Sequence, residues 1–163
     1  MAQISDAFVQ DLLSARRIGS LATENSDGSI HIVAVWYFYD GGAIYIATSS
    51  RSRKAQNLRA RSKVSLMIDS RHPSAQRGIG IMGTARLLTD VPASDWNAKI
   101  HRKYLSSAAL ADVKVGPVFE ALDDVTIQIV PSAVIAWDMR EADRQFFGGV
   151  FRNNPEYLLP VEI

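Results

Sequence analysis

Residues 30–58 have the sequence IHIVAVWYFYDGGAIYIATSSRSRKAQNL, which holds two strand-like segments, a tight turn and the start of a helix. The segments 30–39 and 43–48 are rich in β-branched and aromatic residues, the types that favour β-strands. Asp40-Gly41-Gly42 separates them, and its glycines can take the positive φ of a tight turn. Because parallel strands need a connection of a dozen or more residues, this short link predicts an antiparallel pair.

The rest of the chain adds strands and a few short helices. An apolar run at 18–23, followed by a turn at 25–28, is expected to complete an antiparallel meander with the two strands above. Further strands are predicted at 64–68, 78–89, 125–130 and 133–137, with Gly80 and Gly83 marking bulges or close backbone contacts and Pro131 separating the last two. Helices are predicted from Ser5, as N-cap, to about Gly19, and at 52–61, 92–105, 107–113 and 118–122. Six or seven antiparallel strands with short helices predict a mainly β protein with a closed or half-closed barrel.

The composition is that of an ordinary globular protein, with 47% hydrophobic and 21% charged residues. Cysteine is absent, which excludes disulfides, thiolate metal sites and a thiol nucleophile. The first residues lack the features of a signal peptide, and no apolar run approaches the roughly 20 residues that span a bilayer. We therefore expect a cytoplasmic protein without membrane contact. No repeat or linker divides the chain, so residues 1–163 are expected to form a single domain with an irregular tail from about 139 to 163.

Positive charge gathers after residue 48, although the net charge is only +1. No carboxylate occurs between Gly41 and Ile68, whereas six basic residues lie between 51 and 63. A strand that ends in hydroxyl residues and leads into a helix offers backbone N–H groups and a favourable dipole to an anion. The side-chain donors of this candidate phosphate site are Thr48, Ser49, Ser50, Ser52, Arg53 and Lys54. A solvated basic helix with a serine cap explains the same residues equally well.

Other constellations give weaker signals. His31, His72 and His101 lie far apart without the spacing of a metal site, so no metal is expected and surface or packing roles are favoured. The glycines of 78–83 imitate a dinucleotide fingerprint, but they lie within a strand pattern with no helix directly after it. The basic stretch 51–63 lacks a recognition motif, so binding of nucleic acid is not expected.

Several motifs occur in a defined order along the chain. They are the segments 18–23, 33–48, 52–58, 64–66, 83–87, 130–134 and 137–138. Together they resemble the pyridoxamine phosphate oxidase-like flavin-binding split-barrel superfamily, over roughly residues 5–138. The tail after Arg140 lacks the arginine-rich strand of the vitamin B6 oxidase itself, so pyridoxamine phosphate is not the expected substrate.

The resemblance implies a six- to seven-stranded antiparallel split β-barrel of the FMN-binding type. It also implies a homodimer with a flavin in each of two grooves between the subunits. Carried over by position, Arg53 and Lys54 contact the phosphate, with Thr48, Ser49, Ser50 and Ser52 nearby. The backbone groups of Val33, Ala34, Val35 and Trp36 border the isoalloxazine ring. Asn57 has either a structural role or a ligand contact.

The function implied by the resemblance is a flavin-dependent oxidoreductase that acts on a small molecule. Its cofactor is FMN, or alternatively the deazaflavin coenzyme F-420, whose users share the Trp36 region and the spacing between Lys54 and Asn57. Such a cofactor carries the hydride chemistry itself, which agrees with the lack of an acid–base motif. The alternative hypothesis is a non-enzymatic carrier of flavin, haem or another tetrapyrrole on the same fold.

Overall fold

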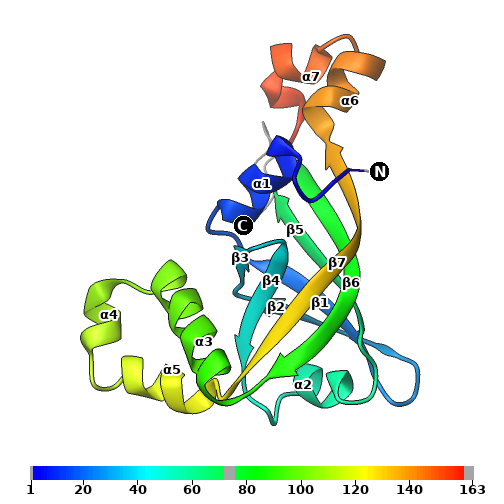
Figure 1. Ribbon diagram of the computed structural model, residues 1–163. Coiled ribbons are helices and arrows are strands. Elements are labelled where there is room, and N and C mark those ends of the chain that lie inside the picture. Colours follow the sequence, from blue (N-terminus) through cyan, green and yellow to red (C-terminus); the bar gives the residue numbers. More distant parts are fainter. Residues whose placement is uncertain (1, 72–75, 160–163) are drawn as a thin grey trace.

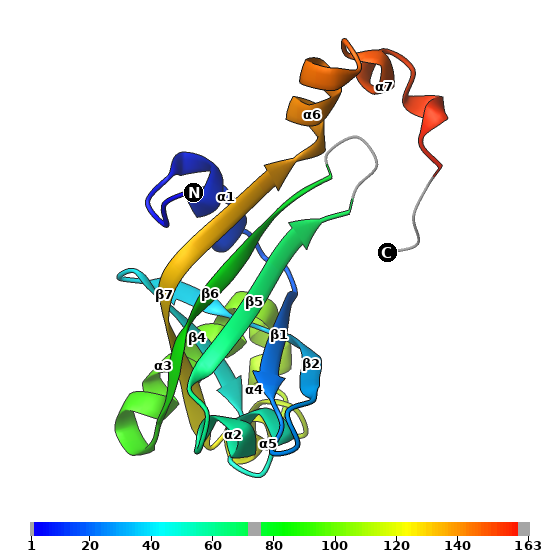
Figure 2. The ribbon, with the colours of Figure 1, turned by 90° about the vertical axis from the view of Figure 1, so that its right-hand side faces the viewer.

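The computed structural model describes residues 2–71 and 76–159, and its centre is one sheet of seven strands (Figure 1, Figure 2). The strands are β1 (Gly19–Glu24), β2 (Ile30–Val35), β3 (Phe38–Asp40), β4 (Ala43–Thr48), β5 (Lys63–Ser70), β6 (Arg77–Leu88) and β7 (Val125–Asp138). Their spatial order is β2-β1-β5-β6-β7-β4-β3, and the pairings between them are antiparallel. The predicted mainly β class and strand number are confirmed.

The sheet curls because its two edge strands follow one another in the chain. β2 ends at Val35 and β3 begins at Phe38, yet these strands occupy opposite edges of the sheet. Only Trp36 and Tyr37 link them, so the two edges approach each other and the sheet closes into a split barrel. The hairpins β1–β2 and β3–β4 are present, but the predicted three-stranded meander is wrong, because β2 pairs with neither β3 nor β4. The predicted single strand 30–39 is broken in two. Its first part, β2, pairs with β1 at one edge of the sheet, and its second part, β3, pairs with β4 at the other edge, because β4 pairs with β7 on its other side.

Inward-facing apolar side chains fill the barrel. Fully buried members of this core include Leu21, Ile46, Leu66, Ile81 and Ile127. Helix α1 (Ala7–Ser14) adds Val9, Leu12 and Leu13 to the same core. The buried Tyr37 hydroxyl donates a hydrogen bond to the carbonyl oxygen of Leu12 at 3.0 Å, which ties the break between β2 and β3 to this helix.

A β-bulge lets β7 run as one long strand where two strands were predicted. The register between β6 and β7 shifts at Met82 and Gly83, and Pro131 pairs with Gly83 while Ala133 pairs with Met82. Ser132 is therefore the extra residue of the bulge, where a proline without a backbone N–H is tolerated. A Cβ atom on Gly83 would lie 2.4 Å from the carbonyl oxygen of Val130, which confirms the predicted close contact at this glycine. Gly80 has open space at the same position, so no close contact exists there.

Short helices cover the ends and one side of the barrel. They are α2 (Arg53–Leu58), α3 (Asp90–Tyr104), α4 (Ser107–Ala111), α5 (Gly116–Leu122), α6 (Met139–Phe146), α7 (Val150–Asn153) and a 3-10 turn at Pro155–Tyr157. Helix α3 packs Ile100 and Trp96 on the outer side of β3 and β4, against Tyr45 and Phe38. No helix of the described residues is long and apolar enough to cross a membrane.

Two predictions about the ends of the chain are wrong. The N-cap of α1 is Asp6 and not Ser5, and the Asp6 carboxylate accepts from the backbone N–H of Gln3 without capping the helix. The tail after residue 138 is helical as far as Asn153 and not irregular. The Asp143 carboxylate produces this order, because it accepts from the backbone N–H groups of Phe151 and Arg152 and so joins α6 to α7.

Candidate functional site

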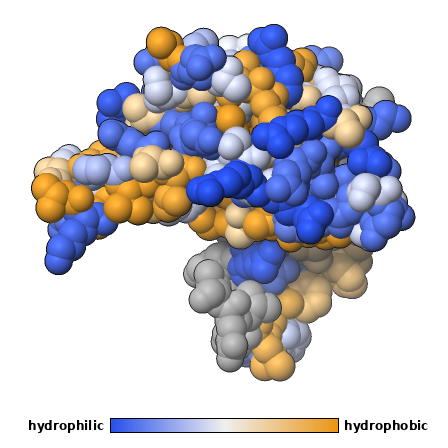
Figure 3. Space-filling model, turned by 90° about the horizontal axis from the view of Figure 1, so that it is seen from below, coloured by the Kyte–Doolittle hydropathy of each residue, from blue (hydrophilic) through white to orange (hydrophobic). Residues whose placement is uncertain are grey.

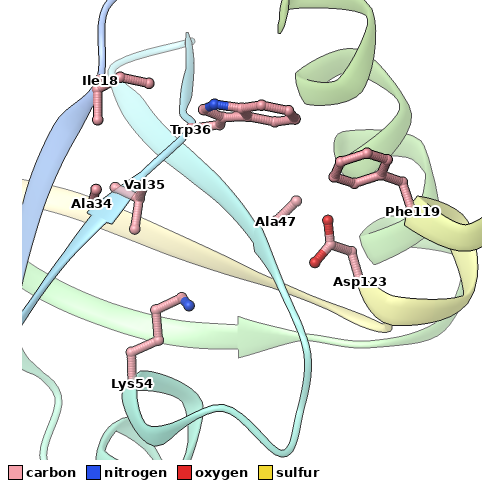
Figure 4. Close-up of a pocket in the computed structure, with 8 residues that line it drawn as sticks. All are labelled: Ile18, Ala34, Val35, Trp36, Ala47, Lys54, Phe119 and Asp123. Atoms are coloured by element: carbon pink, nitrogen blue, oxygen red, sulfur yellow. The ribbon is translucent and has the colours of Figure 1, made fainter. Parts of the chain in front are cut away.

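A pocket of about 260 Å³ opens where the two edges of the barrel separate (Figure 4). Its lining residues are Ile18, Ala34, Val35, Trp36, Ala47, Lys54, Phe119 and Asp123. Four of the predicted site residues are thus brought together: Ala34, Val35, Trp36 and Lys54. The end of β2, the end of β4, the start of α2 and the helix α5 each supply part of the wall.

Unpaired strand edges face each other across this split. In the described part of the chain, β2 pairs only with β1, and β3 pairs with β4 only as far as Tyr45. The outer edges of β2 and of residues 46–48 therefore keep backbone N–H and C=O groups that no neighbouring strand uses. Such groups are able to accept and donate hydrogen bonds at the edge of the pocket.

An aromatic stack forms the wall of the pocket beyond β2. The Trp36 ring lies parallel to that of Tyr104, with centroids 5.0 Å apart, and is stacked on Phe119 at 5.5 Å. Tyr104 in turn accepts from the backbone N–H of Tyr37 and donates to the carbonyl oxygen of Arg17 at 2.6 Å. These bonds fix the stack, so the indole of Trp36 has a defined orientation at the pocket.

Lys54 is the cation of the pocket. It is the second residue of α2, whose N-cap Ser52 accepts from the backbone N–H of Ala55. The side chain is half-buried and points from the helix start toward the pocket (Figure 4). Burial lowers the pKa of Lys54, and the negative charge of Asp123 partly offsets that effect. A partly desolvated amine of this kind binds an anion more strongly than a fully hydrated one.

Asp123 faces the same pocket and was not predicted. Its carboxylate oxygen Oδ2 lies 2.8 Å from Nε2 of His101, whose side chain is buried against Phe119. The backbone carbonyl of Asp123 accepts from the side-chain amide of Asn97 at 2.6 Å. Because His101 and Asp123 are 22 residues apart on different helices, no sequence spacing pointed to this pair.

The hydroxyl groups of the other predicted phosphate donors take part in hydrogen bonds within the protein. The Ser50 hydroxyl and backbone N–H both donate to the Asp124 carboxylate, and these bonds lower the pKa of Asp124. The Ser49 hydroxyl accepts from the backbone N–H of Arg51, and Thr48 donates to the hydroxyl of Ser52. Among the predicted phosphate donors, Lys54 alone lines the pocket.

Two other predicted residues do not line the pocket. Arg53 is exposed on the outer side of α2. Val33 turns its half-buried side chain toward the barrel core, so only its backbone is available to the split. Asn57 has the structural role that was one of its two predicted roles, because its buried amide donates to the side chains of Thr23 and Asn25 at 3.1 and 2.9 Å.

The histidines are spread over the molecule. No group of three potential metal-binding side chains occurs within residues 2–71 and 76–159. His31 is half-buried on β2, and Nε2 of His101 is occupied by Asp123. His72 lies outside the described residues. The segment 78–83 is part of β6, as predicted, and is followed by more strand.

The outer face of the sheet next to the pocket is apolar and lacks a helical cover (Figure 2). The register places Ala34, Ser20, Met67, Gly80 and Ile135 in one row across five strands of this face. Ile32, Ala22, Ser65, Met82 and Ala133 form the next row. Ile32 is 67% and Ile135 55% exposed, which is unusual for large apolar side chains that lie on one continuous surface.

The end of the barrel at the pocket has two kinds of surface (Figure 3). Apolar side chains gather over α4 and α5, where Val113 and Leu122 are exposed, whereas the opposite side is largely hydrophilic. At the pocket itself, α2 contributes Lys54, and α5 contributes Phe119 together with Asp123 at its C-terminal end.

Comparisons with known proteins agree with this fold. The family model of pyridoxamine 5'-phosphate oxidase matches residues 5–137. Among solved structures, a conserved hypothetical protein from Mycobacterium tuberculosis is 25% identical with a TM-score of 0.70, covering 86% of this chain and 88% of that one. A protein described as an F420 reductase is 23% identical with a TM-score of 0.63, and the match covers 77% of this chain and 94% of that one. A FAD-binding protein from Mesorhizobium loti is 20% identical with a TM-score of 0.58, and the match covers 82% of this chain and 94% of that one.

No curated protein sequence matches the chain. The family model nevertheless spans residues 5–137, which include all seven strands except the last residue of β7. On this ground the chain belongs to the pyridoxamine 5'-phosphate oxidase family.

Proposed function

We propose that the chain binds a flavin-type cofactor in the pocket of Lys54 and Trp36 and acts as an oxidoreductase on a small molecule. The cofactor is FMN or the deazaflavin coenzyme F-420. The observation that carries the proposal is the combination, in one pocket, of a desolvated amine, an aromatic wall and unpaired strand edges. Structural neighbours described as an F420 reductase and a FAD-binding protein support the same class of cofactor.

The residues present fit a phosphorylated flavin. Lys54 supplies the positive charge for a terminal phosphate, at the start of a helix. The outer edge of β2 supplies backbone donors and acceptors for the polar rim of a ring system. Ala34 and Ala47 are small enough for a flat ring to approach the two strands closely. When bound, a flavin or deazaflavin supplies hydride transfer to or from the substrate.

The protein's own residues then bind and orient the cofactor and shield it from water. The stack of Trp36 and Phe119 excludes water from one side of the pocket. Asp123, held by His101, places an acceptor opposite Lys54, where it can receive a hydrogen bond from a hydroxyl of the bound molecule. This division of roles gives the pocket one end for an anion and another for a hydrogen-bond donor.

We further infer a homodimer in which a second copy of the chain covers the apolar outer face. Ala34 belongs both to that face and to the lining of the pocket, so the two surfaces are continuous. The pocket is open on one side in the single chain, and a subunit seated on the outer face would close it. The exposed side chains Ile32, Met67, Met82 and Ile135 supply the apolar area that such an interface buries.

The direct test is the identity and affinity of the cofactor. Purified protein should carry or take up FMN or F-420, seen as a visible absorbance band and identified by mass analysis after release. Titration of the apoprotein with FMN, F-420 and riboflavin, followed by cofactor fluorescence, ranks the ligands. A protein that stays colourless and binds none of them contradicts the proposal, and tight binding without turnover of any acceptor would indicate a carrier.

A further inference from the structure

A second cavity, of about 460 Å³, lies on another side of the molecule between α1, β3 and α3. It is lined by Leu13, Ser14, Phe38, Tyr39, Lys99, Arg102 and Lys103. None of these residues lines the pocket of Lys54, so the two cavities are separate. This second cavity is called the α3 cleft below.

Three cations of the α3 cleft have no acidic partner. Lys99, Arg102 and Lys103 form no salt bridge with any carboxylate of the described chain. Arg102 and Lys103 lie in the last turn of α3, where basic residues interact favourably with the helix dipole, whereas Lys99 lies before that turn. The dipole explains neither the cavity beside them nor the partial burial of Lys103.

Aromatic rings hold two of these cations in place. The Lys99 amine lies 3.9 Å from the centre of the Trp96 ring, and the Lys103 amine 4.2 Å from that of Tyr37. Lys103 also donates to the carbonyl oxygen of Leu13 at 3.3 Å, which uses one of its three N–H bonds. The two amines are therefore oriented at the α3 cleft before any ligand arrives, and ordering them on binding costs little.

The charge of Lys103 is poorly compensated. Burial and, to a smaller extent, the neighbouring positive charge of Arg16 together lower the pKa of Lys103 to about 8. Lys99 and Arg102 add more positive charge on the same helix, while Tyr37 and Tyr104 contribute rings but no negative charge at neutral pH. An anion in the cleft would relieve this repulsion and restore solvation to the buried amine.

The opposite wall of the cleft is apolar. It is formed by Leu13 of α1, which is fully buried, and by Phe38 and Tyr39 of the edge strand β3, which are half-buried. We propose that the α3 cleft is a second ligand site that takes a small aromatic anion, with its ring against the edge strand β3 at Phe38 and Tyr39 and its carboxylate or phosphate on Lys99, Arg102 and Lys103. This site is independent of the proposed flavin pocket and does not rest on it.

Calorimetric titration of the full chain with phenyl phosphate, benzoate, inorganic phosphate and benzyl alcohol tests the proposal. Phenyl phosphate or benzoate should bind at least about tenfold more tightly than inorganic phosphate, and benzyl alcohol should bind more weakly still. The relative affinities of phenyl phosphate and benzoate tell which anionic group the cleft prefers. Absence of binding by both aromatic anions at millimolar concentration overturns the proposal.

Charge-reversing variants locate the site. Arg102→Glu should lower the affinity for phenyl phosphate by about ten- to a hundredfold, because the substitution replaces a charge-assisted contact by repulsion. Lys114→Glu, an equal change of charge on an exposed loop, should leave the affinity unchanged. Equal affinity of Arg102→Glu and the unaltered protein, or loss of binding in Lys54→Ala instead, would overturn the assignment to this cleft.

Chemical protection provides a readout that needs no variant. Lys103 should react with acetic anhydride at pH 8 and be protected by phenyl phosphate, as followed by mass analysis of its peptide. Lys114 should react equally with and without phenyl phosphate. Unchanged modification of Lys103 in saturating phenyl phosphate would show that the anion binds elsewhere.

Discussion

Nε2 of His101 lies 2.8 Å from Oδ2 of Asp123, and through this contact a buried imidazole of α3 orients a carboxylate on the wall of the candidate flavin pocket. The side chain of His101 is 3% exposed, whereas that of Asp123 is 19% exposed. The protein interior thus holds one partner rigidly, and the other partner presents an acceptor to the ligand opposite Lys54.

The coupling between these two side chains can be measured. Removal of one partner leaves the other with an unsatisfied buried group, so His101→Ala and Asp123→Ala should each lower the free energy of unfolding by about 1–3 kcal/mol. The double variant should lose less than the sum of the two. Urea unfolding of the four proteins gives the coupling energy, and a value below about 0.5 kcal/mol would contradict a significant interaction.

Lys54→Ala should lower the affinity for phosphorylated ligands much more than the affinity for unphosphorylated ones. The lost charge-assisted contact corresponds to about 1.5–3 kcal/mol, so FMN should bind about ten- to a hundredfold more weakly while riboflavin changes little. Arg53→Ala, an exposed neighbour outside the pocket, is the matched control and should keep most of the FMN affinity. Equal losses for FMN and riboflavin would mean that Lys54 does not contact the phosphate.

Ile32→Glu should convert the proposed dimer to monomers. The substitution places a charge on the apolar outer face, where Ile32 is 67% exposed, so the single chain tolerates it but a buried interface does not. Sedimentation velocity should show the monomer, and the flavin affinity should fall with it. Val113→Glu changes a side chain that is 79% exposed in the turn between α4 and α5 and should leave the assembly intact. A dimer that survives Ile32→Glu would place the interface elsewhere.

Lys103→Met should change how stability depends on pH. Lys103 has a pKa of about 8 in the folded protein against 10.5 for an unperturbed lysine, so between these pH values the unfolded chain binds more protons. The stability of the unaltered protein should therefore rise with pH from about 8 relative to Lys103→Met. Near pH 7 the methionine variant should be more stable by about 1 kcal/mol, since a half-exposed amine retains much of its hydration.

Urea unfolding at pH 7, 8 and 9.5 measures this difference. The highest pH, 9.5, lies below the pKa of Tyr104 in both states. Burial raises the pKa of Tyr104 to about 12 in the folded protein, and its ordinary value in the unfolded chain is 10.0. Lys114→Met is the control for loss of a lysine on an exposed loop. A difference between Lys103→Met and the unaltered protein that stays constant from pH 7 to 9.5 would contradict the lowered pKa.

Gly83→Ala should destabilise the barrel at its bulge. The added methyl group would lie 2.4 Å from the carbonyl oxygen of Val130, and backbone at a bulge can move only by breaking its pairing, so we expect a loss of about 1–3 kcal/mol. Gly80→Ala is the matched control on the same strand, because its methyl group would meet no atom within 4 Å. Its stability should change by less than about 0.5 kcal/mol in urea unfolding. Similar effects of the two variants would show that the bulge tolerates a side chain.

The strands and turns could be predicted because their signals are local. β-Branched and aromatic residues alternate with glycine-containing turns, and the predicted segments agree with β1, β4, β5 and β6 within two residues. Lys54 was found because a basic residue at a strand-to-helix junction has a defined electrostatic role in its own neighbourhood. The break at Trp36 and the helical tail were missed, since a change of edge and a cap from Asp143 both depend on distant contacts.

The amino-acid order alone determined where most strands and turns occur, that basic residues gather at the start of α2, and that the chain has the motifs of its family. Only the tertiary structure decided that β2 and β4 leave unpaired edges beside one pocket, that Asp123 joins Lys54 there, and that Lys99, Arg102 and Lys103 face Phe38 and Tyr39 across a second cleft. The physical reason is the distance along the chain over which each kind of interaction acts. Backbone preference and turn chemistry act over a few residues, whereas a site joins groups that only the packing of the closed barrel brings together.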